Sequence, residues 1–476
     1  MKHARRPYLV ITTLLVACGC TAKLDAIKPQ VALPQRFSGG GAAKLGARWW
    51  RSFNDPELTR LVERALSKSF SLRAAWARVA QARAVAKREG AALYPSLSVQ
   101  ASGGGLISRG RVIASTSLVN VSPFDITGRE DISLGLAASY ELDLWGKLRS
   151  TRDAAKLDLR ASEHDLMAAA ISLSAEVAIA WYRRVEQAAQ LALLETQLRT
   201  NERTLELVTV SWQRGAVRAE DVFRQRQLTE AVRAQKATVQ AALAVQSHRL
   251  AVLVGAVPTA VVAPAGAKTL VKLPPLPRTG VPSKLITRRP DLARLHARVL
   301  AADRRFAAAV ADRLPSLSLS AGILTSGRAV DLFASWIGNL AASIFAPILD
   351  GGRRKAESER FKAQRLELRQ QYTQQVLEAL REVEDALIRE VKQRQLLRSI
   401  ATQLKLAKHV IERVHDSYVN GVGDYLRVLD AYATYQQLQR NELTARRELI
   451  EIRIGLCRAL SGGWKLEAPR AEGKRS

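Results

Sequence analysis

Two cysteines near the N-terminus, Cys18 and Cys20, are the residues best suited to covalent chemistry. They follow basic residues and an apolar run over residues 8–17, a pattern typical of a secretory signal peptide that is too short to span a bilayer. The residues before each cysteine resemble a bacterial lipoprotein cleavage site, where a thiol is acylated and the cysteine becomes the first residue. The alternative is an ordinary signal peptide with incidental cysteines. The third cysteine, Cys457, is predicted to be a small core residue. Because it is the one cysteine left after acylation, no intrachain disulfide framework is possible.

Four charged residues stand at matched distances behind two turn glycines, Gly215 and Gly421. The charged residues six and nine positions later are Asp221 and Arg224 in the first case and Arg427 and Asp430 in the second. The two segments therefore carry opposite charges at each level, and copies of the chain arranged in a ring would form salt-bridged rings around a gate. Each exposed pair would contribute only about 0.2–1 kcal/mol, but coupled pairs would favour a closed state. The alternative is two solvated i,i+3 pairs, each on its own helix.

The sequence offers no catalytic or metal-binding set. Five histidines are scattered along predicted helices without metal-ligand spacing: His164, His248, His296, His409 and His415. The neighbours His415 and Asp416 would face different directions on a helix. Neither a phosphate-binding loop nor a nucleophile elbow is present. We therefore expect no enzyme activity and no cofactor, and any energy must come from a partner.

Very long helices must position these residues. After Asp350-Gly351-Gly352, roughly seventy residues of high helix propensity pass without proline or glycine. Val376, Leu380, Val383 and Leu387 step by four, three and four, which predicts a heptad-like apolar seam. At 1.5 Å per residue the helix would be roughly 100 Å long and must lie against other long helices.

The plan around this helix occurs twice in the chain. The offset is 206 residues for Gly146 and Gly352 and for Gly215 and Gly421, 207 for Gly255 and Gly462, and 220 for Pro95 and Pro315. The 14 additional residues of the first copy therefore lie between Pro95 and Gly146. A constant offset with one loop-sized insertion indicates an internal duplication. Each copy is predicted as helix, strand, strand, long helix and returning helix.

The predicted strands begin near residues 96, 132, 314 and 340 and alternate apolar with small polar residues. At roughly ten residues they match the length of a β-strand that crosses a bilayer. Aromatic residues suited to membrane interfaces stand near their ends: Tyr94, Tyr140, Trp145, Trp336 and Phe345. Four strands leave two unpaired edges, which lipid does not tolerate, so closure needs at least eight strands and two protomers. The soluble alternative is an exposed hairpin on a helical bundle.

Several motifs resemble those of outer-membrane factors of the TolC family, in the family's order and over about residues 20 to 464. They are Trp49-Trp50-Arg51-Ser52-Phe53-Asn54-Asp55-Pro56-Glu57-Leu58, Ser71-Leu72-Arg73-Ala74-Ala75, Tyr140-Glu141-Leu142-Asp143-Leu144-Trp145-Gly146, Arg288-Arg289-Pro290-Asp291-Leu292, Pro347-Ile348-Leu349-Asp350-Gly351-Gly352-Arg353 and Tyr425-Leu426-Arg427-Val428-Leu429-Asp430-Ala431. The chain is most similar to the OprM-like efflux lipoprotein branch. In that branch a proline follows the acylated cysteine by nine residues, so Cys20 with Pro29 is favoured over Cys18.

This resemblance implies a mainly α fold with a small membrane β-part. It implies a homotrimer with a twelve-stranded β-barrel and a barrel of long helices, whose periplasmic tip docks a periplasmic adaptor and an inner-membrane RND-type pump. The chain would be the lipid-anchored outer-membrane channel of a tripartite efflux system that exports small molecules. In the family acidic residues often line the tip constriction. Asp430 aligns with the commonest of these acids, whereas the basic Arg427 departs from that pattern.

The net charge of +29 suits nucleic acid, an anionic membrane surface or anionic cargo. Basic residues are spread along the whole chain, which disfavours a nucleic-acid partner.

We expect a signal peptide (1–19), a lipidated tether laid along the surface (20–48), the first repeat (49–270), a Pro-rich linker (271–285), the second repeat (286–464) and a basic tail (465–476). The alternatives are an exit duct for type I protein secretion and a periplasmic coiled-coil scaffold without a pore.

Overall fold

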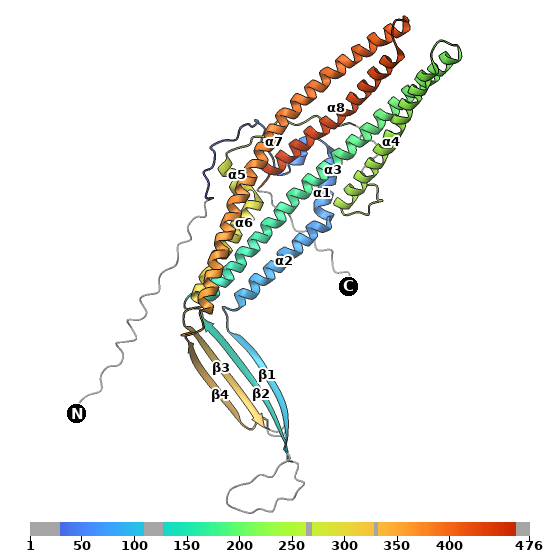
Figure 1. Ribbon diagram of the computed structural model, residues 1–476. Helices are drawn as coiled ribbons and strands as arrows, with labels where there is room; N and C mark the ends of the chain where they lie inside the picture. The colour runs from blue at the N-terminus through green and yellow to red at the C-terminus, as the bar shows by residue number, and fades with distance from the viewer. Residues whose placement is uncertain (1–28, 109–126, 263–268, 328–331, 463–476) are drawn as a thin grey trace, which may run out of the picture. The chain divides into compact units, whose positions relative to one another are not determined.

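A computed structural model describes residues 29–108, 127–262, 269–327 and 332–462 (Figure 1). The fold is mainly helical, with one four-stranded antiparallel sheet, as the sequence predicts. Cys18, Cys20, the predicted signal peptide and the basic tail lie outside the described residues.

The two copies have the same order of elements. The first holds α1 (Pro56–Lys68), α2 (Phe70–Ala91), β1 (Ser96–Ser108), β2 (Thr127–Leu142), α3 (Lys147–Gln213) and α4 (Ala219–Leu253), after a short 3-10 helix (Trp49–Phe53). The second holds α5 (Pro282–Arg288), α6 (Pro290–Ala311), β3 (Ser316–Gly327), β4 (Trp336–Phe345), α7 (Arg353–Val419) and α8 (Tyr425–Leu460). Both long helices, α3 and α7, contain 67 residues.

Local sequence explains where the helices begin. The Asp55 carboxylate accepts hydrogen bonds from the backbone N–H groups of Glu57 and Leu58, both at 3.0 Å, and Pro56 occupies the first helical position of α1. The heptad seam of α7 is confirmed, because Val376, Val383 and Leu387 are buried and Leu380 is partly buried.

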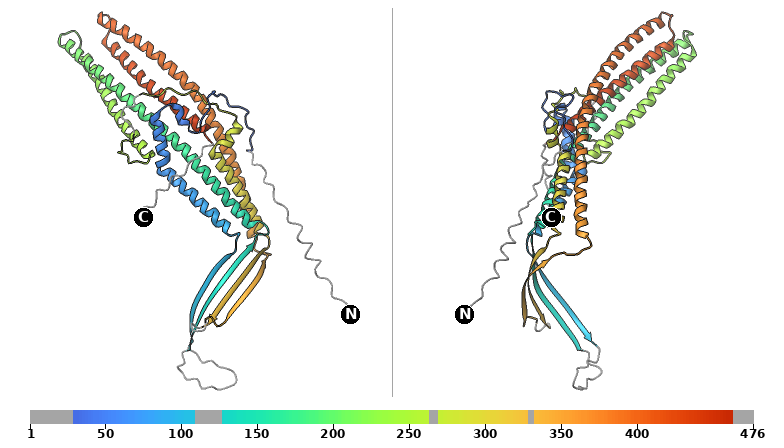
Figure 2. Two further views of the ribbon diagram at one scale, coloured as in Figure 1. Left: turned by 180° about the vertical axis from the view of Figure 1, so that it is seen from behind. Right: turned by 60° about the vertical axis from the view of Figure 1, so that its left-hand side comes forward.

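The sheet has the order β1-β2-β3-β4, and Figure 2 shows the strands side by side. The registers place most apolar side chains of the four strands on one face, whereas Leu324, Ile337 and Phe345 lie on the other. The apolar face holds Leu97, Val99, Ala101, Ile132, Leu134, Leu136, Ala138, Tyr140, Leu142, Leu317, Leu319, Ala321, Ile323, Leu340, Ala342 and Ile344. The other face is rich in serine, and hydroxyl pairs join neighbouring strands, as between Ser96 and Ser139 at 2.8 Å. One face therefore suits lipid and the other suits water.

The chain divides into two compact units, and each contains parts of both copies. The first unit comprises the sheet with the adjoining segments 81–95, 143–160, 297–315 and 346–370. The second comprises the remaining helices and both of the turns that follow α3 and α7. The two copies are therefore interleaved in the folded chain, and neither forms a compact unit alone.

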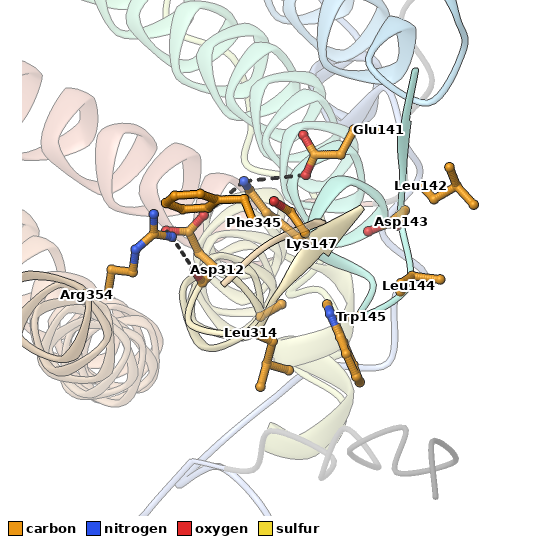
Figure 3. Close-up of a pocket in the computed structure, with 12 residues that line it drawn as sticks. Glu141, Leu142, Asp143, Leu144, Trp145, Lys147, Asp312, Leu314, Phe345 and Arg354 are labelled. Carbon is orange, nitrogen blue, oxygen red and sulfur yellow. Dashed lines mark hydrogen bonds and ion pairs between the residues drawn. The ribbon is translucent and has the colours of Figure 1, made fainter. Parts of the chain in front are cut away.

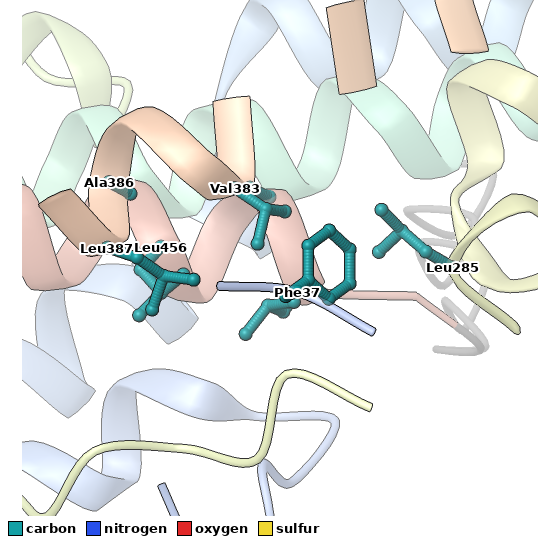
Figure 4. Close-up of a cluster of buried hydrophobic side chains, with 8 residues drawn as sticks. Phe37, Leu285, Val383, Ala386, Leu387 and Leu456 are labelled. Carbon is teal, nitrogen blue, oxygen red and sulfur yellow. The ribbon is translucent and has the colours of Figure 1, made fainter. Parts of the chain in front are cut away.

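Two clusters form much of the core of the second unit. Trp49, Trp50 and Phe53 are buried with Tyr182, and Trp181 Nε1 donates to Asp55 Oδ2 at 2.8 Å. The other cluster surrounds Phe37 and includes Leu285, Val383, Ala386, Leu387, Leu456, Ala459 and Leu460. Figure 4 shows the Phe37 ring between Val383 and Leu285. The described tether residues are mostly exposed, and Phe37 anchors the segment through a burial that the sequence does not predict.

Candidate functional site

Gly215 and Gly421 stand at the turns that end α3 and α7, and both have a φ of 75°. At each turn the glycine N–H bonds to the carbonyl three residues back, and the next N–H bonds five residues back. This left-handed backbone conformation ends a helix at glycine, because residues that carry a Cβ adopt it only under strain. We name the two turns, each with its flanking helix ends, the first tip and the second tip.

The returning helices begin differently at the two tips. In the second tip the Asp424 carboxylate caps α8 and accepts from the N–H of Leu426 at 3.1 Å. The equivalent position in the first tip, 206 residues earlier, is Arg218. There Asp221 takes over the capping, and its Oδ2 accepts from the N–H of Arg218 at 3.3 Å. The capping acid thus stands three positions later in the first tip than in the second. For this reason Asp221 occupies the position that corresponds to Arg427, and the two charges are opposite.

The four predicted gate residues lie in different environments. Asp221 is only 8% exposed, Arg224 is half-buried, and Arg427 and Asp430 are exposed. In the part of the chain that the structure describes, neither i,i+3 pair forms an ion pair. Arg427 and Asp430 are therefore available at the protein surface, whereas Asp221 points into the tip.

A cluster that the gate prediction omits joins the two tips. Val208 and Val222 of the first tip are buried with Tyr425, Val428 and Leu429 of the second. The Tyr425 hydroxyl donates to Gln225 Oε1 at 3.0 Å, and the Tyr425 and Tyr418 ring centroids are 5.3 Å apart. The only sequence signal for this cluster is the presence of two tyrosines beside Gly421.

The electrostatics of this cluster keep the phenols neutral. Burial raises the pKa of Tyr425, and the neighbouring Tyr418 and Asp221 raise it further. Burial and Asp221 likewise raise the pKa of Tyr418. Both hydroxyls therefore remain hydrogen-bond donors throughout the physiological pH range.

The outer strands of the sheet have no partner on one side among the described strands. The residues of β4 are all exposed, with Leu340 at 85% and Ile344 at 75%, and Val99 of β1 is 68% exposed. Apolar edges of this kind pair with another chain or aggregate unless they are covered.

Charged residues surround a pocket of about 240 Å³ next to the sheet (Figure 3). Asp312 accepts from Lys147 Nζ at 2.9 Å and from Arg354 Nη1 at 2.6 Å, while Trp145 Nε1 donates to the carbonyl of Pro315 at 2.6 Å. The opposite charges compensate one another, so we assign these contacts to holding the strand ends on the helices. Among the described residues, no group of three or more His, Cys, Asp or Glu side chains is placed to hold a metal ion.

Residues 61–256 and 281–462 match the family profile described as outer membrane efflux protein. The chain is 32% identical to the pyoverdine export outer membrane protein OpmQ of Pseudomonas aeruginosa, over 95% of each chain. It is 29% identical to the toluene efflux pump outer membrane protein TtgC of Pseudomonas putida, over 98% of this chain and 97% of TtgC. The crystal structure of the transmembrane channel protein CusC matches with a TM-score of 0.79 and 27% identity, over 92% of this chain and 99% of CusC.

Proposed function

Because this chain belongs to the outer membrane efflux protein family, we propose that three copies of it form the exit duct of a tripartite efflux pump. The chain is an outer-membrane efflux channel, and the proposal concerns its assembly, its gate, its anchor and its cargo. The observation that carries the assembly is the four-stranded sheet with one apolar face and two open edges.

Closure of this sheet requires β4 of one copy to pair with β1 of the next. Three copies supply twelve strands, whose apolar face meets lipid and whose serine-rich face lines the lumen. The exposed side chains of β4 then become lipid-facing or lumen-facing wall. No exposed edge remains in the membrane, as the absence of water there demands.

The partners at the other end are a periplasmic adaptor and an inner-membrane RND-type pump. Apolar side chains stand exposed at both tips, with Trp212 at 46%, Phe223 at 66% and Val422 at 84%. Such side chains at a helical end support docking of another protein. The cargo is a small molecule, as the names of OpmQ and TtgC indicate for those relatives.

The gate consists of the two tips of each copy. Arg224 and Asp430 alternate in one ring around the pore, and the exposed Arg427 adds a second, basic level. Asp221 supports the ring from behind, because it caps α4 and its negative charge raises the pKa of the neighbouring Tyr418 and Tyr425. This gate differs from one lined by acids alone, and we expect it to disfavour the entry of cations.

Acylation of Cys20 anchors the mature chain to the outer membrane, with Cys18 as the alternative site. One acylated terminus adds membrane affinity without a spanning helix. Cys20→Ser should abolish incorporation of labelled palmitate, whereas Cys18→Ser should not. The reverse pattern would assign the anchor to Cys18.

Interprotomer cross-linking tests the assembly. Cysteines at Val99 of β1 and at a series of β4 positions, including Leu340 and Ala342, should form a disulfide-linked trimer at one register. Cysteines on the central strands β2 and β3 serve as the matched control and should leave monomers. A scaffold without a pore would give monomers throughout.

Drug entry tests the gate. Arg427→Glu should admit large antibiotics and raise the conductance of the purified protein in planar bilayers. The control is Arg413→Glu, an exposed arginine on α7 outside the proposed ring. Unchanged conductance and unchanged drug entry for Arg427→Glu would rule out the basic level of the gate at Arg427.

A further inference from the structure

A series of hydrogen-bonded side chains runs between α3 and α8 toward the tips. It consists of Gln197 and Asn201 of α3, Gln225 of α4, and Gln436 and Tyr425 of α8, each at most 5% exposed. Asn201 and Gln436 bond reciprocally, through Gln436 Nε2 to Asn201 Oδ1 at 3.1 Å and Asn201 Nδ2 to Gln436 Oε1 at 3.5 Å. We name this series the amide ladder.

The remaining contacts of the ladder are also specific to one alignment of the helices. Gln197 Nε2 donates to the carbonyl of Gln436 at 3.3 Å and to Gln439 Oε1 at 2.9 Å. Gln225 Nε2 donates to the carbonyl of Asn201 at 2.9 Å, and its Oε1 accepts from Tyr425. The ladder thus ends at the tyrosine that joins the two tips.

A buried polar seam is an unusual way to pair long helices. The contact between α7 and α8 includes an apolar cluster with Val383, Leu387 and Leu456, and such contacts tolerate sliding by a turn or a heptad. A buried amide that slides loses its partner, and an unpaired buried polar group is costly. Buried polar residues in coiled coils accordingly fix register at some cost in stability.

Because of the internal duplication, the chain contains similar helices that could pair in more than one way, and one pairing must be selected. The returning helices α4 and α8 contain 35 and 36 residues, so an apolar seam alone would distinguish them poorly. The residues 206 positions away from Asn201 and Gln436 are Ala407 and Glu230, which have no reciprocal amide pair. The ladder therefore distinguishes one pairing of α3 from the alternatives that the duplication creates.

We propose that the amide ladder is a register lock that aligns the two tips of each copy and thereby positions the gate. Its members are positioning residues and do not touch cargo. A slip of α8 by one turn would move Arg427 and Asp430 by about 5.4 Å along the helix axis relative to Arg224. The consequence for the gate rests on the proposed function, whereas the register itself does not.

The test replaces the reciprocal pair by an apolar pair of similar size, Asn201→Leu with Gln436→Leu. Because well-packed apolar residues often replace buried polar groups without loss, the melting temperature should stay within about 3 °C of wild type. Spin labels at the exposed positions Arg203 and Gln437 report the register, in sparsely labelled trimers on a Cys457→Ala background. The wild type should give one distance, and the double variant a second population shifted by about 5 or 10 Å, one turn or one heptad.

Two variants serve as controls. The swap Asn201→Gln with Gln436→Asn keeps an amide pair and should keep the single distance. Val383→Ala weakens the α7–α8 contact and should lower the melting temperature without changing that distance. Cells with the double leucine variant should become several-fold more sensitive to a large antibiotic, and cells with either control should not.

The outcomes separate the register lock from the efflux gate. A single, unshifted distance in the double leucine variant would overturn the register lock, whatever the drug sensitivity. A shifted distance without added drug entry would keep the lock and contradict the gate. A melting temperature that falls while the distance stays single would assign the ladder to stability alone.

Discussion

At the scale of single residues, the two tips show how one physical requirement is met by two side chains. Both returning helices begin with unsatisfied N–H groups and a positive dipole end, which favour an acid in the first turn. Asp424 supplies it before the first helical residue of α8, and Asp221 supplies it three positions later in α4. Because Asp424 already caps α8, position 427 does not need an acid to begin the helix, and the exposed Arg427 occupies it.

The buried thiol of Cys457 provides a direct test of the core around α8. Burial raises the pKa of Cys457 to about 12, from an ordinary value of 9.0. Since only the thiolate reacts with alkylating agents, its population at pH 8 falls about a thousandfold. We expect no alkylation of Cys457 by iodoacetamide in the folded protein at pH 8 and complete alkylation in denaturant. Rapid labelling of the folded chain would show that this core is open.

A second residue-scale prediction concerns the buried ion pair of Arg453 and Glu390. Arg453 is fully buried; its Nε donates to Glu390 Oε2 at 2.8 Å, and its Nη1 donates to the carbonyl of Pro275 at 3.0 Å. Removing Arg453 leaves the buried Glu390 with the exposed Arg394 as its cationic partner, at 3.0 Å, so Arg453→Met should cost about 3–5 kcal/mol of unfolding free energy. Arg453→Met with Glu390→Leu should recover most of that loss, as measured by denaturant unfolding in detergent. Equal losses in the single and double variants would contradict the pairing.

How much of the tip is predictable from sequence depends on how far apart in the chain the contacting residues lie. The turns at Gly215 and Gly421 follow from local signals, because a helix that ends at glycine needs no distant partner. The contact between Tyr425 and Gln225 joins residues 200 positions apart, and no local pattern reports it. Asp221 was predictable as a charge, but its burial depends on packing of the second tip against the first.

At the scale of elements, the described tether is fastened to the second copy. The Phe37 ring is buried against α5, α7 and α8, and the N–H of Ser38 donates to Glu384 Oε1 at 3.0 Å. Farther on, the N–H of Gly41 donates to the carbonyl of Pro277 at 2.9 Å in the Pro-rich linker. The sequence predicts the linker from its prolines, but an isolated phenylalanine in a segment without periodicity gives no sign that it is buried.

Phe37→Ala tests this attachment. Emptying a buried aromatic site should destabilise the second unit by about 3–5 kcal/mol and release the tether. The expected sign is faster proteolysis between residues 29 and 48 in the native protein, at protease concentrations that leave the wild type intact. Arg36→Ala, which changes an exposed neighbour, is the control. Equal cleavage of the two variants would mean that Phe37 does not hold the tether.

At the scale of the whole molecule, the alternation of apolar and polar residues carries the membrane assignment. The described residues include one helix, α3, with a stretch apolar enough to cross a membrane, but 61% of that stretch is buried inside the protein. The sheet instead exposes its apolar face along its outer strands. This alternation was readable in the sequence because it is local to each strand. The order of the strands was not, because β2 pairs with β3 across a separation of some 180 residues in the chain.

Paired lysine substitutions on β4 test the assignment of the two faces. Leu340 belongs to the apolar face and Ala341, its neighbour, to the opposite face. A lysine that faces lipid near the bilayer centre costs about 2–4 kcal/mol, whereas a lysine in the lumen stays hydrated. Leu340→Lys should therefore reduce the amount of heat-modifiable trimer in the outer-membrane fraction. Ala341→Lys should assemble normally and shift the current of the reconstituted channel toward anions. Because a sheet exposed to water on both faces would accept either lysine equally, equal assembly of the two variants would exclude the membrane barrel.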